Sequence, residues 1–354
     1  MTRAPEPIRW RDGRLELLDQ TLLPRQTVYE TQPTLEAVFA AIHGLKVRGA
    51  PAIGIAAAYG LVVAMQVHRS ATGTAFVNAL RAAADRLRTA RPTAVNLAWA
   101  IDRIVAAAQP DGDGAARYAR IEAEALAIHA QDRLMCAAIG RAGQHLITPG
   151  CGVLTHCNAG ALAVSELGTA TAPMYLAHEA GVAFRVYAGE TRPLLQGSRL
   201  TAWELLQAGI DVTLICDSMV ARVMAEGAID LVIVGTDRVA RNGDVVNKIG
   251  TSGIAILARH FGIPFYVACP SSTFDPHTPT GATVVIEERD GDEVRSVLGH
   301  ATAPPGIKVR NPAFDVTPYA LVSGFITDAG LLLPPFSESL RRLTVNPGAA
   351  RHVL

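Results

Sequence analysis

Reactive or polar side chains follow four short apolar runs that are typical of buried strands. The four runs span residues 152–156, 183–187, 230–234 and 264–269. Cys157 follows the first run directly, and Asp237 comes two residues after Gly235 at the end of the third. Ligands of open parallel sheets collect beyond the carboxyl ends of the strands. The spacing therefore predicts a small-molecule site at one edge of a sheet, with a thiol and a carboxyl among its groups.

The thiol of Cys157 has two interpretations on position alone. A cysteine is most often a small buried hydrophobe, and Cys136 and Cys216 are expected to be core residues of that kind. Cys157 differs because it leaves its strand into a turn containing Gly160, where backbone N–H groups could stabilise a thiolate. Both interpretations stay open at this point.

The carboxyl of Asp237 also has two interpretations. It could cap a helix or pair with Arg238 or Arg241, which would give it only a structural role. Alternatively, an apolar site could hold the carboxyl and raise its pKa, so that it donates a proton at neutral pH. The sequence alone does not choose between them.

Three stretches combine basic or polar residues with a small-residue turn before a predicted helix. They are Arg48-Gly49-Ala50-Pro51, Gln196-Gly197-Ser198-Arg199 and Asn247-Lys248-Ile249-Gly250-Thr251. The free N–H groups of a helix N-terminus favour phosphate and other anions. Capping motifs look the same one at a time, but three in one chain favour a phosphorylated ligand.

Several other chemistries find no support in the residues. No G-x-G-x-x-G follows the first run and no Walker A lysine is present, which argues against dinucleotide and P-loop sites. No H-E-x-x-H or Cys/His ligand spacing indicates zinc. His156 precedes Cys157, but neighbours on a strand point to opposite faces, so His156 is expected to be structural.

Composition narrows the class of protein. Acidic and basic residues balance at 32 each, so no net field attracts nucleic acid or an anionic membrane. Five cysteines form no C-x-x-C pair, which favours a reducing compartment and a cytoplasmic protein. The first ten residues lack the apolar core of a signal peptide. Residues 51–68 are long and apolar enough to suggest a membrane span, but their Ala and Gly content favours a buried core helix.

The elements that must position these residues form an α/β protein. Residues 1–147 are predicted to be a mainly helical N-terminal domain, with helices in the Ala-rich stretches 72–89, 94–108 and 115–146. Pro92 and the 110–114 cluster separate these stretches, and a small β-hairpin region turns at Asp12-Gly13. Residues 148–354 alternate five predicted strands, the four runs above and a fifth at 211–216, with helices near 172–181, 199–208, 217–227 and 252–262. Such repeated βα units predict a Rossmann-like, mostly parallel domain.

With these residues in view, the chain resembles the methylthioribose-1-phosphate isomerase family over nearly its whole length. The first matching motifs are Arg48-Gly49-Ala50-Pro51-Ala52-Ile53-Gly54, Arg91-Pro92-Thr93-Ala94-Val95-Asn96-Leu97, Thr155-His156-Cys157-Asn158-Ala159-Gly160, Glu190-Thr191-Arg192-Pro193 and Gln196-Gly197. The later ones are Gly235-Thr236-Asp237-Arg238, Asn242-Gly243-Asp244, Asn247-Lys248-Ile249-Gly250-Thr251, Ile286-Glu287-Glu288-Arg289 and Asn311-Pro312-Ala313-Phe314-Asp315-Val316-Thr317-Pro318. Thr236 stands where alanine is more usual, and the departure leaves the aspartate in place.

The resemblance implies an aldose–ketose isomerase that converts 5-methylthioribose 1-phosphate to 5-methylthioribulose 1-phosphate in methionine salvage. It implies catalysis by Cys157 and Asp237. It implies substrate contacts from Arg48, Gly49, Ala50, Arg91, Gln196, Asn247 and Lys248. It also implies a cytoplasmic homodimer without a metal or other cofactor, whose partner is a small sugar phosphate and neither nucleic acid nor a membrane.

Two alternatives use much the same fold. One is isomerisation of another sugar 1-phosphate, either 5-deoxyribose 1-phosphate or ribose 1,5-bisphosphate. The bisphosphate would need a second basic cluster, and none is obvious. The other is a non-enzymatic regulatory subunit like those of initiation factor 2B, which would not need both Cys157 and Asp237. Their joint presence favours the enzyme.

Overall fold

The computed structural model describes residues 4–345 apart from 93 and 110, with side chains described as far as 340. Thr93 of the second matching motif and Pro110 of the predicted separator therefore lie outside the described residues. By contacts between residues the chain divides into two compact units. One comprises Pro5–Leu134 and Ala161–Gly168, and the other comprises Met1–Ala4, Met135–Gly160 and Thr169–Leu354. The predicted domain boundary at 147/148 stays a prediction, since one long helix runs across the change of unit.

The first unit combines a small antiparallel sheet with helices, as the sequence predicts. Its strands are β1 (Ile8–Arg11), β2 (Arg14–Leu18) and β3 (Tyr29–Thr31), and its helices are α1 (Leu35–His43), α2 (Ala50–Met65), α3 (Gly73–Arg88), α4 (Val95–Ala107) and the first part of α5 (Gly114–Gly143). The turn at Asp12-Gly13 has φ values of 52° and 72°, the geometry that joins two strands tightly. Thr34 and Thr72 accept hydrogen bonds from the amides of Ala37 and Ala75, which fixes where α1 and α3 begin.

Helix α2 is the apolar centre of this unit. Its window Ala50–His68 is long and apolar enough to cross a membrane, but 72% of that window is buried inside the protein. Its buried residues pack in one core with those of α1, α3 and α4, and Ile55, Leu61 and Val62 are almost fully covered. This is the burial expected of the core helix of a globular protein.

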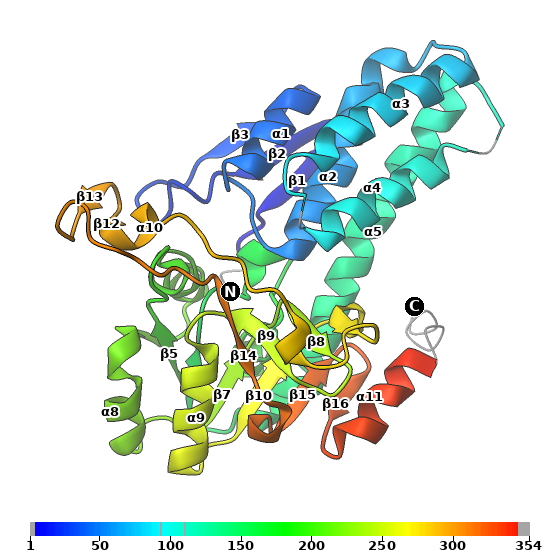
Figure 1. The fold of residues 1–354 in the computed structure, drawn as a ribbon. Helices are drawn as coiled ribbons and strands as arrows, with labels where there is room; N and C mark the ends of the chain where they lie inside the picture. Colours follow the sequence, from blue (N-terminus) through cyan, green and yellow to red (C-terminus); the bar gives the residue numbers. More distant parts are fainter. Residues whose placement is uncertain (1–3, 93, 110, 346–354) are drawn as a thin grey trace. The chain divides into compact units, whose positions relative to one another are not determined.

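The second unit is built on a seven-stranded sheet in the order β16-β15-β10-β7-β4-β5-β6 (Figure 1). The strands are β4 (Gly152–Thr155), β5 (Arg185–Gly189), β6 (Val212–Ile215), β7 (Leu231–Val234), β10 (Phe265–Ala268), β15 (Gly324–Thr327) and β16 (Gly330–Leu332). All neighbouring pairs are parallel except β15 and β16. The five predicted strands are all present and contiguous, so the Rossmann-like, mostly parallel sheet is confirmed.

Helices cover both faces of this sheet. They are α6 (Ala172–Glu179), α7 (Ala202–Gln207), α8 (Val220–Ala225) and α9 (Thr251–Phe261), with α11 (Phe336–Val345) beside β16. Helices α8 and α9 lie side by side (Figure 1) and share a core with Phe325 of β15. The next strand residue, Ile326, meets Gly143 at the end of α5, which packs near α6. Since successive strand residues point to opposite faces, the sheet is buried on both sides, as its continuous apolar strands require.

A smaller sheet in the same unit has the order β11-β8-β9-β14 and was not predicted. Its strands are β8 (Arg238–Ala240), β9 (Val245–Lys248), β11 (Phe274–Asp275) and β14 (Phe314–Thr317). A further hairpin, β12 (Ser296–Val297) with β13 (His300–Ala301), follows the short helix α10 (Asp292–Arg295). The small sheet carries the segment from Asp237 to Lys248, so it positions three of the predicted site residues, Asp237, Asn247 and Lys248.

Candidate active site

The carboxyl ends of the strands bring the predicted chemistry to one edge of the sheet. Strands β10, β7, β4 and β5, whose ends were singled out from the sequence, are contiguous and parallel. Cys157 follows the central strand β4, and Asp237 follows its neighbour β7, with Val153 paired to Leu231 and Leu154 to Val232. The thiol and the carboxyl therefore leave the ends of adjacent strands.

Cys157 has an unusual backbone that is held on both sides. Its φ is 62°, in the left-handed region that non-glycine residues seldom occupy. Its N–H donates to Thr191 Oγ1 at 2.8 Å, and its carbonyl accepts from Thr201 Oγ1 at 2.6 Å. The side chain is half-buried. Cys157 is thus not a simple core cysteine, whereas Cys136 is buried as expected and Cys216 is half-buried.

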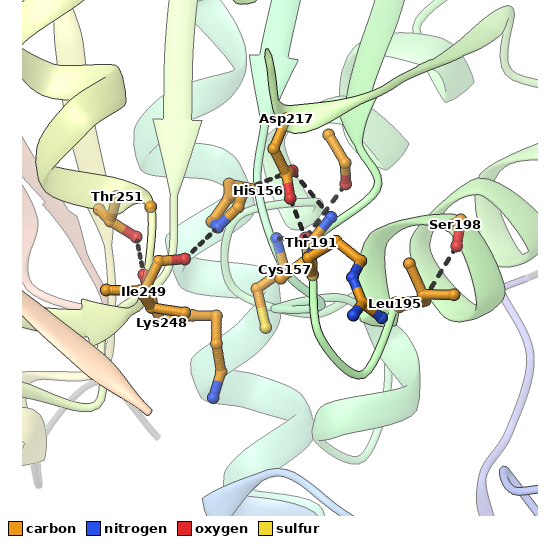
Figure 2. Close-up of polar contacts among 12 residues, drawn as sticks. His156, Cys157, Thr191, Leu195, Ser198, Asp217, Lys248, Ile249 and Thr251 are labelled. Atoms are coloured by element: carbon orange, nitrogen blue, oxygen red, sulfur yellow. Dashed lines mark hydrogen bonds and ion pairs between the residues drawn. The ribbon is translucent and has the colours of Figure 1, made fainter. Parts of the chain in front are cut away.

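The loop after β5 is held by the loop after β6. Thr191 also has a left-handed backbone, with φ 64°, and is fully buried. Asp217 accepts hydrogen bonds from the N–H of Thr191 at 2.9 Å and from that of Arg192 at 2.7 Å. Figure 2 shows Asp217, Thr191 and Cys157 in succession along these contacts. A carboxylate that accepts two backbone amides fixes the loop on which Thr191 sits.

His156 has a structural role, as predicted. It is 2% exposed, and its Nε2 donates to the carbonyl of Ile249 at 2.9 Å. Its Nδ1 lies 3.9 Å from Asp217 Oδ1. Burial lowers the pKa of His156 because it disfavours the charged imidazolium, so the ring is neutral at pH 7. A Cβ at Gly250 would stand 3.0 Å from His156 Nε2, so glycine allows this close approach.

The bond from His156 brings Lys248 to the same sheet edge. Lys248 Nζ donates to the carbonyl of Ala313 at 3.0 Å and lies 4.7 Å from the centre of the Phe314 ring. In Figure 2 its ammonium and the Cys157 thiol point to the same side of the sheet edge. The neighbouring Asn247 is buried, and its Nδ2 donates to Thr251 Oγ1 at 3.1 Å. Asn247 therefore joins β9 to the start of α9.

The start of α9 differs from the expectation of a free anion site. Asp315 of β14 accepts from the N–H of Gly250 at 2.8 Å and from that of Ser252 at 3.1 Å. The helix N-terminus thus already holds an anionic group of the chain itself. Burial is the largest influence on Asp315 and raises its pKa to about 6, although the amide bonds and Lys248 oppose it.

Asp237 also departs from one expectation. Asp237 is exposed, so the apolar surroundings that one of its two interpretations required are not provided. It does not cap a helix, because strand β8 follows it. The Asp237 N–H donates to the carbonyl of Val246 at 3.0 Å, which ties the end of β7 to β9. The backbone is well fixed and the carboxyl is accessible.

Gln196 offers a buried acceptor. Its side chain is 8% exposed, and its Oε1 has no hydrogen-bond partner among the residues that the structure describes. A π-helical turn, Gly197–Thr201, follows and leads into α7. Ser198 Oγ donates back to the carbonyl of Leu195 at 3.2 Å (Figure 2). A buried amide oxygen without a partner costs free energy, which a ligand hydroxyl would recover.

The remaining predicted contacts lie in the other unit, at the start of α2 and in the α3–α4 connection. Gly49 is the N-cap of α2, with φ 91°, and Ala50 is its first residue. A Cβ at Gly49 would stand 2.3 Å from the carbonyl oxygen of Ala163, so only glycine fits. Arg48 and Arg91 are half-buried. The carbonyl of Arg91 accepts from the N–H of Ala94 at 3.0 Å.

Thr191, Thr201 and Asp217 were not predicted from the sequence to take part in the site. Thr191 lies in a strand-end motif quoted above, and Asp217 directly follows a predicted strand, so position alone could have singled out both. Thr201 lies on the turn before α7 and carries no such signal. Within the described part of the chain, no three His, Cys, Asp or Glu side chains are grouped so that they could hold a metal ion.

Known proteins match both the sequence and the fold. Residues 46–334 match the Initiation factor 2 subunit family. A 5-deoxyribose 1-phosphate isomerase from Bacillus thuringiensis (strain Al Hakam) is 52% identical over 339 residues, covering 95% of this chain and 98% of that protein. A methylthioribose-1-phosphate isomerase from Gemmatimonas aurantiaca is 53% identical over 323 residues, covering 91% and 92%.

A solved structure extends the match to three dimensions. The crystal structure of 5-methylthioribose 1-phosphate isomerase from Pyrococcus horikoshii OT3 has a TM-score of 0.92 and 39% identity, and covers 97% of each chain. The resemblance found in the motifs is therefore confirmed by the sequence matches and by the fold. This chain belongs to the Initiation factor 2 subunit family, within which it is similar to methylthioribose-1-phosphate isomerases.

Proposed function

We propose that this protein is an aldose–ketose isomerase of a sugar 1-phosphate, in which Cys157 and Asp237 act on the sugar. The observation that carries the proposal is the placement of a thiol and a carboxyl at the ends of the adjacent strands β4 and β7. Relatives at more than half identity over nearly the whole chain are named as sugar-phosphate isomerases. A regulatory subunit would need neither group.

The substrate we propose is 5-methylthioribose 1-phosphate, and the product 5-methylthioribulose 1-phosphate, a step of methionine salvage. The names of the Gemmatimonas and Pyrococcus proteins support this choice. An ordinary aldose opens to a free aldehyde, but phosphate on the anomeric oxygen blocks that route. The enzyme must therefore assist the opening of the ring.

Asp237 is proposed to supply the proton for ring opening. Transfer of a proton to the ring oxygen lets the bond between that oxygen and C1 break, and the hydroxyl at C4 is freed. An exposed carboxyl is accessible to a sugar, but it must be protonated to act as an acid. A bound phosphate dianion and the exclusion of water by the substrate would both favour its protonated form.

Cys157 is proposed to act next, when hydrogen moves from C2 to C1. The thiolate could remove the C2 proton to give an enolate that is reprotonated at C1. It could instead take the proton of the 2-hydroxyl while a hydride shifts from C2 to C1. In both routes the 2-hydroxyl becomes the ketone and the thiol ends next to C2. Incorporation of solvent hydrogen at C1 separates the routes, since only the enolate exchanges.

The phosphate and hydroxyl groups need partners of their own. We propose Arg48 and Arg91, with the backbone of Gly49 and Ala50 at the start of α2, for the phosphate, and Lys248 as a further cation. The buried Oε1 of Gln196 suits a sugar hydroxyl, and Asn247 would complete this side of the site. Each residue belongs to a motif of the family resemblance.

A second candidate substrate is 5-deoxyribose 1-phosphate. The Bacillus thuringiensis relative, which carries that name, is as similar to this chain as the methylthioribose-1-phosphate isomerase is. The two sugars differ only in the group on C5, a hydrogen against a methylthio group. Neither is charged, so the choice depends on apolar contacts, which distinguish substrates by only about 1–3 kcal/mol per group.

The setting we propose is a cytoplasmic homodimer of two-domain subunits that works without a metal or other cofactor. All five cysteines are free thiols in the structure, which suits a reducing compartment. Gel filtration with light scattering tests the dimer. Unchanged turnover after dialysis against EDTA tests independence from metal.

The experiment that tests the function is a comparison of three substrates. The purified protein is given 5-methylthioribose 1-phosphate, 5-deoxyribose 1-phosphate and ribose 1,5-bisphosphate in parallel, and kcat/KM is measured for each. We expect the methylthio sugar to have the highest value. A higher value for 5-deoxyribose 1-phosphate would transfer the assignment to the second candidate. No turnover of any of the three would refute the enzyme and favour a regulatory binding subunit.

A further inference from the structure

We infer that Thr191 and Thr201 are positioning residues that hold the backbone of Cys157 in its left-handed conformation and so direct its thiol at the substrate. The inference rests on the proposed function for its catalytic consequence. Its structural part concerns only the second unit, in which all of these residues lie. The two hydroxyls bind the amide and the carbonyl of one residue. Thr191 is in turn held by Asp217, and Thr201 is linked through Asn158 to Glu204.

The first contact fixes the amino side of Cys157. Its N–H donates to Thr191 Oγ1 at 2.8 Å, and that hydroxyl donates to the carbonyl of Gly189 at 3.1 Å. Thr191 is itself held, because its N–H donates to Asp217 Oδ1 at 2.9 Å. The hydroxyl is fully buried, so water cannot replace it. The position of the Cys157 amide therefore depends on Thr191.

The second contact fixes the carbonyl side. Thr201 Oγ1 donates to the carbonyl of Cys157 at 2.6 Å. Asn158 Nδ2 donates to Thr201 Oγ1 at 3.1 Å and to Glu204 Oε1 at 2.9 Å. Thr201, Asn158 and Glu204 are each at most 3% exposed. A buried carboxyl thus orients an amide, the amide orients a hydroxyl, and the hydroxyl holds the peptide that follows Cys157.

The directions of these hydrogen bonds are consistent with one another. Each threonine hydroxyl has one proton, which it gives to a backbone carbonyl, and each accepts one bond from an N–H group. Neither hydroxyl has an alternative proton position that satisfies the same partners. The arrangement therefore specifies one conformation at Cys157.

Such a conformation needs this support. A left-handed backbone is unfavourable for any residue with a Cβ, and it persists only where the surroundings fix it. Without the hydroxyls, Cys157 would relax towards an ordinary conformation and its side chain would change direction. A misplacement of about 1 Å at a reacting group can lower the rate on the order of 100-fold. Binding of the sugar phosphate, which uses other residues, would change little.

The test replaces each hydroxyl by a methyl group of the same size. Thr191→Val and Thr201→Val remove the hydrogen bonds, Thr191→Ser and Thr201→Ser keep them, and kcat and KM are measured separately. For each valine variant we expect kcat to fall about 10- to 100-fold with KM within about threefold of the wild type. The serine variants should recover most of the lost rate.

Thr327 provides a matched control. It is also fully buried, and its hydroxyl accepts from the N–H of Ala329 at 3.1 Å and donates to the carbonyl of Gly330 at 2.8 Å. Thr327→Val should lower the melting temperature and leave kcat unchanged. If it lowered kcat as much as Thr191→Val does, the loss would reflect general destabilisation and the inference would be wrong.

A crystal structure of the Thr191→Val/Thr201→Val double variant separates this inference from the proposed function. We expect φ at Cys157 to leave the left-handed region. If φ stayed near its present 62° and kcat stayed at the wild-type value, the positioning role would be refuted. If φ changed but the wild-type protein turned over no sugar phosphate, the proposed function would fail while the two threonines would still be what holds Cys157.

Discussion

Two helices of this protein begin in much the same way but differ in whether a carboxyl of the chain binds their first amides. Helices α2 and α9 each start after a glycine with positive φ, 91° at Gly49 and 103° at Gly250. A basic residue precedes each glycine: Arg48 stands directly before Gly49, and Lys248 stands two residues before Gly250. At α9 the first amides bind Asp315. Both N-caps are glycines without a side chain to accept these amides, so the carboxyl that β14 supplies at α9 is what distinguishes the two helix starts.

The difference shows that a helix start is an anion site only if the fold leaves it open. Asp315 is distant from Gly250 in the sequence, but β14 pairs antiparallel with β9 and brings Phe314 opposite Lys248. The carboxylate thereby reaches the start of α9 and takes the place that a phosphate would occupy. We therefore expect the phosphate at the start of α2, and we expect Lys248 to act as a separate cation rather than as part of an anion-binding helix.

The largest effect is expected from Gly49→Ala. An alanine there would need a left-handed backbone and would place its Cβ 2.3 Å from the carbonyl oxygen of Ala163. The strain and the displacement together should lower the free energy of unfolding by more than about 2 kcal/mol. In the folded fraction, KM for the sugar phosphate should rise, because the first amides of α2 are displaced. Chemical denaturation and steady-state kinetics measure the two effects.

Gly253→Ala is the corresponding change in α9. Nothing lies within 4 Å of a Cβ at Gly253, so alanine there should stabilise the helix by about 0.5–1 kcal/mol and leave KM unchanged. If Gly49→Ala had the same free energy of unfolding and the same KM as the wild type, the start of α2 would not bind the phosphate.

The next largest effect is expected when the charge of Arg48 or of Lys248 is removed, and the two changes should differ in size. Arg48→Gln should raise KM for the sugar phosphate about 10- to 100-fold, the range expected when a charged hydrogen-bond donor to a phosphate is lost. Lys248→Gln should raise it less than about tenfold, because Asp315 already occupies the helix start beside it and leaves no helix amides there for a phosphate. Isothermal titration with the sugar phosphate measures both affinities. If Lys248→Gln lost more affinity for the sugar phosphate than Arg48→Gln, the phosphate would bind beside α9 and not at α2.

Arg222→Gln serves as the matched control for these charge changes. Arg222 is exposed on α8 and pairs with Glu226 one turn later. Its loss removes one positive charge from the surface of the unit that contains Lys248, so the affinity for the sugar phosphate should stay the same within error. A change as large as that in Arg48→Gln would indicate a general effect of net charge.

The smallest effect is expected in the pH dependence of stability that comes from Asp315, whose carboxyl binds the first amides of α9. The folded protein raises the pKa of Asp315 to about 6, above its ordinary value of 3.8, so the fold favours the protonated form. The stability that this group contributes is therefore present below about pH 4 and is lost as the pH rises through 6. Relative to Asp315→Asn, the wild type should lose about 1 kcal/mol between pH 4 and pH 7, after allowance for solvent screening. A pH-independent difference between the two would contradict this account.

Periodicity and strand-end position predict most of the fold and the placement of the thiol. The five strands were recognisable because each is a short, mainly apolar run, and all but β6 are largely buried. Their parallel order follows from the helices between them. Strands β8, β9 and β14 were missed because they are short and partly polar, and because β14 pairs with β9 across a long stretch of chain. Long-range pairings of that kind leave no local pattern.

Parts of the candidate site could not be predicted for related reasons. The left-handed backbone of Cys157 and the hydroxyls of Thr191 and Thr201 depend on three separate segments meeting. The exposure of Asp237 depends on the hairpin of β8 and β9, which turns the chain back after β7. Residue type identifies a reactive group, but its surroundings are set by tertiary contacts that only the structure contains.

The central claim, that Cys157 and Asp237 isomerise a sugar 1-phosphate, is tested most directly by turnover and binding in matched variants. The wild type, Cys157→Ser and Asp237→Asn are assayed with 5-methylthioribose 1-phosphate, and Cys216→Ser serves as the control because Cys216 is also a half-buried thiol. We expect the first two changes to lower kcat at least about 1,000-fold while the affinity for the sugar phosphate and the melting temperature stay close to those of the wild type. Near-normal turnover by either variant, or an equal loss in Cys216→Ser, would contradict the assignment.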